Sequence, residues 1–493
     1  MKRTCLIPLL SALLLAAVSC GGEAASPADS SENTPSPADT AAVTDAETEP
    51  QLYDAGDIQY DGYTFRVWSF DNEGVNGWTG IPNDIDVDAE SGDLLNDSIF
   101  RRNKTVEDAL NIVIELSDSK TDTTDLRKSV MAGSSDCDAY FPREYDLVAC
   151  VTGGLVLDMM SVDAFDGFTA PWWQKSSVDA MTIRGQLYSV GSDITYWDKL
   201  STYVVFFNRQ MVENYDLGDL YQLVADGGWT FDNMLAMGDI VSQDIDNNAV
   251  YDLNDVYGVS CQNDGAYIFL HAGGLTVCDR DSDGSIAFNL NKETHVNALQ
   301  TIFGVMTDKK RYFNRQDFNA DLNSAVNMFV ENRALFLIRP IQSLFLMRDM
   351  AADFGILPLP KLYETQDGYH SAVNPYSATM LVLPKSLEDP ERSAVVTSYL
   401  ASVSSASVIE PLYETVLGSK LIRDERSPAM LDLAFDGAVY DVGLIWNFGE
   451  FINPTLLTNR STDIVSLVGK HQSKIDRAIA ALDEIYSEAE ALG

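Results

Sequence analysis

The segment YTFRVWSF at residues 63–70 gives the clearest indication of the fold. Its aromatic and β-branched residues are typical of a strand, and a polar, glycine-containing loop at residues 71–78 ends it. Apolar residues then recur at helical spacing through residues 94–110, and a second strand is predicted at residues 111–116. Strand, helix and strand in this order predict an open α/β sheet, in which ligands bind at the carboxyl ends of the strands.

The alternation of strands and helices continues through the rest of the chain. Thr230 is the predicted N-cap of a helix over residues 231–241, and prolines end a short strand at residues 354–360. The last helix, over residues 462–492, has apolar residues at helical spacing with charges between them. Other predicted strands cover residues 145–152, 200–207 and 334–338, and a further helix covers residues 325–333.

Composition limits the classes of protein to which the chain can belong. Of its 493 residues, 46% are apolar and 22% charged, so most of the chain is expected to be globular. A domain holds about 100 to 200 residues, so this length predicts two or three domains. Lysine and arginine number 33 against 74 acids, which gives a formal net charge of -41. Such a negative field repels phosphate backbones and anionic membrane surfaces, so nucleic acid is excluded as a partner.

The N-terminus has the order of a secretory signal peptide, predicted over residues 1–19. Lys2 and Arg3 precede an apolar run at residues 6–18, which is shorter than the roughly 20 residues that span a bilayer. The sequence AVSCG around Cys20 resembles the lipobox of bacterial lipoproteins, with Ala17 where leucine is usual. This resemblance implies that Cys20 is lipidated and becomes the mature N-terminus.

Residues 20–52 are predicted to be a disordered acidic tether. Within them, residues 21–50 carry seven acids, no basic residue and no aromatic residue, so they cannot bury enough apolar surface to fold. A folded body is expected to begin near Tyr53. The predicted location is therefore extracytoplasmic, with the protein held at the cell membrane by its N-terminal lipid alone.

The four remaining cysteines do not indicate a disulfide scaffold or a metal site. Cys137, Cys150, Cys261 and Cys278 permit three pairings, and their number is small for a body of this size. Their separations do not match the C-x-x-C pattern of zinc sites. One disulfide or none is expected.

A series of short motifs resembles the extracellular solute-binding proteins of bacterial ABC importers. The likeness is to family 1, the carbohydrate-binding type, in lipoprotein form. Each motif alone is weakly specific, but together they follow the expected order from about residue 55 to about residue 450. They are RRNKTVE at 101–107, YDLV at 145–148, GQLYSV at 185–190, VFFNR at 205–209, GWTFD at 228–232, FGILPLP at 354–360, VLPK at 382–385 and RDERS at 423–427.

The resemblance implies a two-lobed α/β fold of the periplasmic-binding-protein type II. In this arrangement crossover strands join the lobes, which close on a solute by rotation at a hinge. The first crossover is expected near residues 205–208 and the second near residues 374–379. Lobe 1 is then expected to comprise residues 53–206 and 376–415, and lobe 2 residues 207–375 and 416–493.

Sugar sites need aromatic faces for stacking and planar polar groups for hydroxyls, because a buried hydroxyl without a partner costs about 1–3 kcal/mol. Position along the chain and the resemblance select the candidates, against the alternative of ordinary packing or solvated loops. Trp78 and Trp197 are the expected stacking residues, whereas Trp229, beside a helix cap, is expected to be structural. The predicted ligand-binding residues are Asp71, Trp78, Thr152, Asp193, Tyr196, Trp197, Arg339, Gln342, Asn374 and Tyr376.

One acidic segment has the oxygen-ligand spacing of a calcium loop. Ala249 stands where glycine usually allows a sharp turn, and the last ligand, Asp255, is shorter than the usual glutamate. A similar run at residues 279–286 has Leu290 in place of the last acid, so a hairpin turn is expected there. The predicted calcium ligands are Asp244, Asp246, Asn248, the backbone carbonyl of Val250, Asp252 and Asp255.

These observations predict a monomeric receptor that captures a sugar or oligosaccharide and delivers it to ABC permease subunits, without catalysis and with no cofactor other than calcium. Two alternatives remain: the same fold binding peptides or another small solute, and a surface lipoprotein that hydrolyses glycans. The sequence contains none of the motifs G-x-S-x-G, H-E-x-x-H or G-x-x-x-x-G-K-[ST]. With 74 acids in the chain, any pair chosen for glycoside hydrolysis is uninformative.

Overall fold

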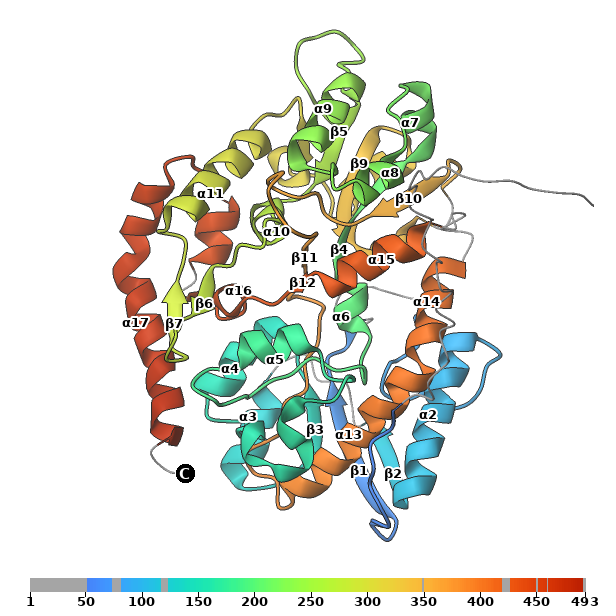
Figure 1. Ribbon diagram of the computed structural model, residues 1–493, viewed down its shortest axis with the longest axis vertical. Coiled ribbons are helices and arrows are strands. Elements are labelled where there is room, and N and C mark those ends of the chain that lie inside the picture. The colour runs from blue at the N-terminus through green and yellow to red at the C-terminus, as the bar shows by residue number, and fades with distance from the viewer. Residues whose placement is uncertain are drawn as a thin grey trace, which may run out of the picture. The chain divides into compact units, whose positions relative to one another are not determined.

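The strand–helix–strand unit near the N-terminus forms a parallel three-stranded sheet (Figure 1). β1 (Tyr63–Ser69) lies at its centre, between β2 (Ile112–Leu116) and β3 (Ala139–Phe141). The helix that joins β1 to β2 is α2 (Leu94–Leu110); its N-cap, Asp93, accepts a hydrogen bond from the backbone N–H of Asn96 at 3.0 Å. The part of the molecule built on this sheet is called lobe 1.

A mixed five-stranded sheet forms the centre of a second part, called lobe 2. Its order is β10-β4-β9-β5-β8, with β4 antiparallel to both β9 and β10 and with β5 parallel to β8 and β9. Every residue of these strands is buried, as expected for a sheet covered on both faces. The strands are β4 (Tyr203–Asn208), β5 (Tyr257–Cys261), β8 (Tyr312–Asn314), β9 (Ala334–Pro340) and β10 (Phe354–Leu357).

This computed structural model describes residues 51–72, 81–116, 123–347, 350–418, 426–448, 451–458 and 460–490. Trp78, Cys20, the predicted signal peptide and the predicted tether up to residue 50 lie outside the described residues. Within the described chain, no helix has the length and apolar character needed to cross a membrane.

Helices of various lengths surround the two sheets, and two short two-stranded sheets complete the fold. The short sheets are β6 (Cys278–Arg280) with β7 (Ile286–Phe288), which confirms the predicted hairpin, and β11 (Ser371–Ala372) with β12 (Ala438–Val439). The remaining helices are α3 (Thr124–Ala132), α4 (Leu147–Thr152), α5 (Lys175–Met181), α6 (Trp197–Leu200), α7 (Arg209–Asn214), α8 (Leu220–Ala225), α9 (Phe231–Val241), α10 (Gly265–Ala272), α11 (Glu293–Met306), α12 (Ser324–Val330), α13 (Pro390–Ser407), α14 (Ile409–Gly418), α15 (Ser427–Asp436), α16 (Val442–Ile445) and α17 (Ile464–Glu490).

The chain passes between the lobes through two adjacent segments. The residues before β4 pair with the second segment at Thr202 and Val373, and that segment then reaches lobe 1, where Val382 pairs with Tyr140 of β3. The predicted first crossover at residues 205–208 falls within β4, so the chain already belongs to the sheet of lobe 2 from Tyr203 onward. The lobe boundaries themselves stay a prediction.

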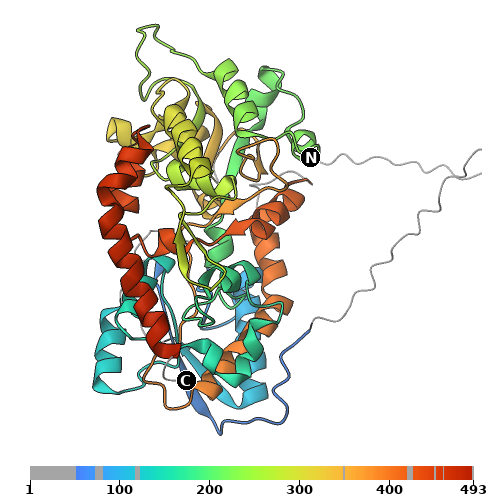
Figure 2. The same cartoon turned by 60° about the vertical axis from the view of Figure 1, so that its left-hand side comes forward.

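Two later helical regions, α13 to α15 and α17, also contact both lobes. In the first region, α13 packs against α2 of lobe 1 and α15 packs against β10 of lobe 2. Figure 2 shows α17 passing alongside the elements of both sheets. It packs against α11, and near its end Asp483 accepts hydrogen bonds from the Arg184 guanidinium at 2.8 and 2.9 Å.

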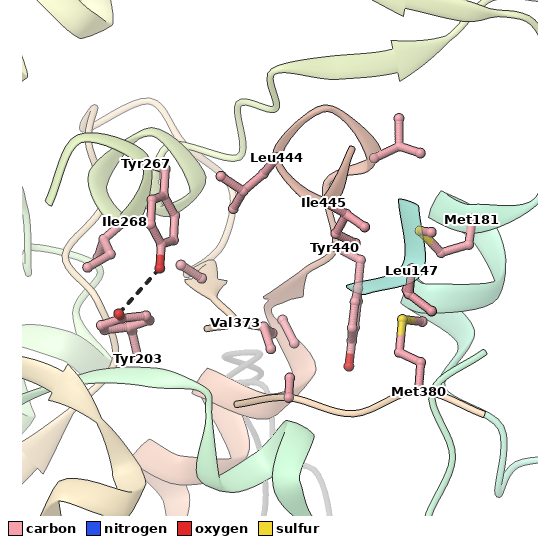
Figure 3. Close-up of a cluster of buried hydrophobic side chains, with 14 of the residues drawn as sticks. Leu147, Met181, Tyr203, Tyr267, Ile268, Val373, Met380, Tyr440, Leu444 and Ile445 are labelled. Carbon is pink, nitrogen blue, oxygen red and sulfur yellow. Dashed lines mark hydrogen bonds between the residues drawn. The ribbon is translucent and has the colours of Figure 1, made fainter. Parts of the chain in front are cut away.

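One cluster of buried apolar side chains is continuous through both lobes and includes residues of β1 and β4 alike. Figure 3 shows part of it: Tyr203 and Tyr267 lie on one side, Leu147 and Met380 on the other, and Tyr440 between them. The core therefore continues past the crossover segments.

The segment predicted as a strand at residues 145–152 is helical instead. It forms a short turn at Glu144–Asp146 followed by α4, and the strand of this region is β3, a few residues earlier. A short apolar run bounded by glycines fits a buried helix as well as a strand, so periodicity could not decide between them. The strand predicted at residues 200–207 begins later, at Tyr203, so residues 200–202 lie outside it.

The four cysteines in the described part of the chain are buried. Cys150, Cys261 and Cys278 are free thiols, and Cys137 is buried as well. Burial raises the pKa of Cys150 to about 12 and that of Cys261 to about 11, so both stay protonated and unreactive at neutral pH.

A close approach of α9 to β5 gives the first testable prediction. A Cβ added at Gly258 would lie 2.3 Å from the Cα of Gly238. Gly258→Ala is therefore expected to lower the free energy of unfolding by about 1–3 kcal/mol, because the backbones must separate. Urea denaturation measures the change. Gly304→Ala on α11, where no atom lies within 4 Å of the added Cβ, is the control and should be neutral or stabilising; equal losses in both variants would contradict the prediction.

Candidate ligand-binding site

A cavity of about 430 Å³ lies where the carboxyl ends of β5, β8 and β9 meet the crossover segments. These three strands run parallel, so their carboxyl ends share one edge of the sheet, the usual place for a ligand in α/β folds. We call this cavity the crossover pocket. Its lining residues are Tyr203, Gln262, Asn263, Asp264, Arg315, Gln316, Leu322, Arg339, Gln342, Asn374, Tyr376, Ser377, Leu457 and Thr458.

The pocket concentrates buried polar atoms that have no hydrogen-bond partner among the described residues. They are Nε of Arg339, Nε of Arg315, Oε1 of Gln342 and Nε2 of Gln262. Arg339, Gln342 and Gln262 are each buried, at 6%, 0% and 6% exposed. A buried polar group without a hydrogen bond costs about 1–3 kcal/mol, so this many in one cavity indicate a surface made for a polar ligand.

Hydrogen bonds within the protein hold the pocket walls in place. The Tyr267 hydroxyl donates to the Tyr203 hydroxyl at 3.3 Å, and Tyr203 donates to Oδ2 of Asp264 at 3.2 Å. Nδ2 of Asn314 donates to Oδ1 of Asn263 at 2.7 Å. These contacts fix the loop after β5, from which the side chains of residues 262–264 reach the cavity.

The second crossover supplies the opposite wall. Oδ1 of Asn374 accepts a hydrogen bond from the Tyr376 N–H at 3.1 Å, which turns the chain at this point. The ring of Tyr376 lies 5.0 Å from that of Tyr145, centre to centre, so the second crossover and lobe 1 together form an aromatic surface beside the pocket. Tyrosine faces of this kind can stack on the C–H surface of a sugar ring.

Four of the predicted ligand residues therefore share one pocket: Arg339, Gln342, Asn374 and Tyr376. Asp71 lies at the end of β1 beside Asn72, whose Nδ2 donates to the backbone oxygen of Ser377 at 3.0 Å. Asp71 is thus placed next to the pocket wall without lining the cavity.

The other candidates lie elsewhere. Asp193 accepts a hydrogen bond from Nζ of Lys199 at 2.8 Å and lines a separate cavity of about 970 Å³. Trp197 and Tyr196 are buried in the apolar core around α6, and the Tyr196 hydroxyl donates to the Pro82 carbonyl. Thr152 is exposed at the end of α4, and its hydroxyl donates to the Val148 carbonyl at 2.6 Å.

Trp229 has the structural role expected for it. It is fully buried, and its Nε1 donates to the Pro358 carbonyl at 2.9 Å.

Sequence reasoning missed Gln262, Asp264 and Arg315. These residues follow β5 and β8, which have five and three residues and carry little periodic signal. A prediction of those two strands would have placed all three residues at the ligand edge of the sheet.

Burial raises the pKa of several carboxyl groups, among them Glu144 and Asp84. Glu144 is buried, its N–H donates to the Ala378 carbonyl at 2.9 Å, and its Oε1 has no partner in the described chain. Burial, reinforced by Asp198, raises its pKa to about 8. Burial also raises the pKa of Asp84 to about 7, although the nearby Arg102 guanidinium opposes this shift.

The predicted calcium loop brings three carboxylates together. Ligand oxygens of Asp244, Asp246 and Asp255 lie within 4.8 Å of one another, which suits a cation that prefers oxygen ligands. Ala249 adopts a φ of 65°, the left-handed conformation that glycine takes more easily. The side-chain oxygens of Asn248 and Asp252 accept hydrogen bonds from backbone N–H groups of their own turn. Calcium binding stays a prediction.

Comparison with known proteins shows the fold. No protein-family model matches the chain, and no curated protein matches it. A cyclo/maltodextrin-binding protein in complex with maltotetraose has a TM-score of 0.53 at 13% identity, covering 87% of this chain and 98% of its own. RafE from Streptococcus pneumoniae, in its apo-form, has a TM-score of 0.51 at 11% identity, covering 87% and 99%. The ABC substrate-binding protein Lmo0181 from Listeria monocytogenes, in complex with cycloalternan, has a TM-score of 0.50 at 14% identity, covering 87% and 100%.

The chain thus has the two-lobed α/β fold of these substrate-binding proteins, which confirms the predicted fold class.

The buried Glu144 leads to a prediction about pH. Its folded pKa of about 8 exceeds the ordinary value of 4.5, so the folded state holds a proton that the unfolded chain releases between these values. Stability should therefore fall as pH rises from about 4.5 to 8. Glu144→Gln is expected to reduce this fall, as measured by urea denaturation at several pH values. Glu213→Gln, on the exposed face of α7, should leave the pH profile unchanged; an unaltered profile in Glu144→Gln would contradict the assignment.

Calcium is expected to raise the melting temperature, because a cation bound only by the folded state stabilises it. Differential scanning calorimetry with calcium, magnesium or a chelator measures the shift. Asp246→Asn should abolish it, whereas Asp281→Asn, in the hairpin turn between β6 and β7, should not. A melting temperature that does not respond to millimolar calcium would show that the loop binds none.

Proposed function

We propose that the protein is the extracytoplasmic receptor of an ABC importer and captures a sugar or small oligosaccharide between its two lobes. The observation that carries this proposal is the set of buried, unpartnered amide and guanidinium groups in the crossover pocket. A saccharide offers many hydroxyls at short spacing, and such groups satisfy them in pairs.

The size and position of the pocket support a small polar ligand. Its volume of about 430 Å³ falls within the roughly 300–1,000 Å³ of ligand pockets in proteins. It lies against the segments that join the lobes, so a ligand that contacts these segments can favour one arrangement of the lobes over another. The ligands in two solved complexes of proteins with this fold, maltotetraose and cycloalternan, are saccharides.

The lining of the pocket favours binding over hydrolysis. Among the described lining residues, Asp264 is the only carboxylate. Glycoside hydrolysis generally uses a pair of carboxyl groups on either side of the scissile bond. A pocket with one acid and several amides is better suited to holding a saccharide than to cleaving it.

Attachment and delivery complete the proposal. Lipid at Cys20 would hold the receptor at the cell membrane, and residues 20–52 would let it move above the membrane and meet the permease. The net charge of -41 would keep the receptor away from the anionic lipid surface between these encounters.

Ligand-induced stabilisation tests the proposal. A bound saccharide at about 100 times its Kd is expected to add about 2.7 kcal/mol to the free energy of unfolding, which appears as a rise of a few degrees in the melting temperature. Thermal unfolding with a panel of mono- and oligosaccharides, amino acids and short peptides measures the rise.

Two variants test whether the ligand-induced rise in melting temperature depends on the pocket. Gln342→Leu should remove most of the ligand-induced rise, because the buried amide is lost, whereas Gln222→Leu on the exposed face of α8 should keep it. A response to peptides alone would keep the fold and reject the saccharide. Release of product from a labelled glycan would reject the receptor.

A further inference from the structure

Basic groups outnumber acidic groups in the crossover pocket, whereas acidic residues outnumber basic residues in the chain as a whole. The whole sequence has 74 acids and 33 basic residues, excluding histidine. The charged groups among the described lining residues are two guanidinium groups, Arg315 and Arg339, and one carboxylate, Asp264. A local excess of positive charge in so acidic a protein indicates that these arginines serve the ligand of the pocket.

Arg339 is the more deeply buried of the two arginines. It lies near the end of β9, opposite Val204 of β4, and is 6% exposed. Its Nε has no hydrogen-bond partner, and the guanidinium makes no ion pair with any described residue. Burying a charge without a directly paired counter-charge is costly, and the carboxylate that acts on this cation, Asp264, forms no ion pair with it.

Arg315 brings a second cation to the same cavity from the end of β8. A terminal nitrogen of its side chain donates to the Ala320 carbonyl at 3.1 Å, and its buried Nε has no partner within the described part of the chain. The two arginines thus reach one pocket from two strands of the same sheet, with β5 between them.

The single carboxylate of the pocket cannot balance the charges of both arginines. Asp264 accepts its hydrogen bond from Tyr203 and makes no ion pair with Arg315 or Arg339. Burial raises the pKa of Asp264, although both arginines oppose the shift. The pocket therefore keeps a surplus of positive charge.

We infer that the crossover pocket selects an acidic saccharide, one that carries a carboxylate of the uronic acid type, with Arg339 and Arg315 as the partners of that carboxylate. This inference rests on the proposed function and adds a ligand class to it. The planar fork of a guanidinium matches the two oxygens of a carboxylate, and such charge-assisted pairs are the strong ones. Gln342, Gln262 and Asn374 remain for the hydroxyl groups.

The net negative charge of the chain does not prevent an acidic ligand from binding inside the pocket. Charges are screened beyond about 8 Å at physiological ionic strength, so groups inside the pocket decide the preference. The distant acids act mainly on the rate at which the ligand approaches.

Titration calorimetry on the protein with matched pairs of disaccharides tests the inference. Each pair has an acidic and a neutral member: digalacturonate with galactobiose, dimannuronate with mannobiose, and cellobiouronate with cellobiose. For at least one pair, the acidic member is expected to bind at least about 10-fold more tightly, the lower end of what a charge-assisted hydrogen bond supplies.

Variants connect the preference to the arginines. Arg339→Gln should weaken binding of the acidic member about 10- to 100-fold and change the neutral member much less, so that the preference disappears. Arg333→Gln, directly before the first residue of β9 and outside the pocket, is the matched control and should keep the preference. Arg315→Gln is the second variant, to be used together with a check of folding by circular dichroism, in case Arg339→Gln does not fold.

The outcomes separate the two proposals. Tighter binding of the neutral members, or a preference that survives both arginine variants, overturns the acidic class and leaves the sugar receptor standing. Binding of no saccharide, acidic or neutral, overturns both.

Discussion

The hydrogen bonds that converge on Ser377 are the constraint on which the rest of the structure depends. Its hydroxyl lies 2.7 Å from that of Ser201 and accepts from Nε2 of Gln342 at 3.2 Å, while its backbone oxygen accepts from Asn72. One serine thereby joins the loop after β1, both crossover segments and the segment after β9. Because Ser377 also lines the pocket, the contacts that hold the lobes together and those that shape the cavity are partly the same. A change at this position would alter both.

Local signals in the sequence were enough to predict the elements with strong periodicity or clear caps. β1, α2 and β2 formed where predicted, and Thr230 caps α9, its hydroxyl accepting from the Asn233 N–H. Residues 145–152 could not be assigned in this way, because a short buried run has no polar face to set a period. Whether such a run becomes helix or strand depends on neighbours that are distant in sequence.

The candidate site residues also differ in how far local sequence signals could place them. Arg339, Gln342, Asn374 and Tyr376 were predicted because each follows a recognisable strand or lies at a predicted crossover. Asp193 and Trp197 were chosen for their proximity in sequence to the first crossover, but helix α6 turns the chain there, so that Trp197 enters the core and Asp193 pairs with Lys199. Proximity along the chain is a poor guide where a single helical turn can redirect a side chain.

The position of β4 in its sheet has a consequence for the order of folding. β4 is complete at residue 208, yet both of its neighbours, β9 and β10, come from residues 334–357. The sheet of lobe 1 has a similar dependence, since β3 pairs with Val382. The sheet of lobe 2 cannot be completed until residue 357 of the 493 has been made, and lobe 1 lacks the pairing with Val382 until residue 382 has been made. Pairings this distant in sequence form slowly, so a newly made chain is expected to spend longer without its completed sheets than a chain whose strands pair with near neighbours.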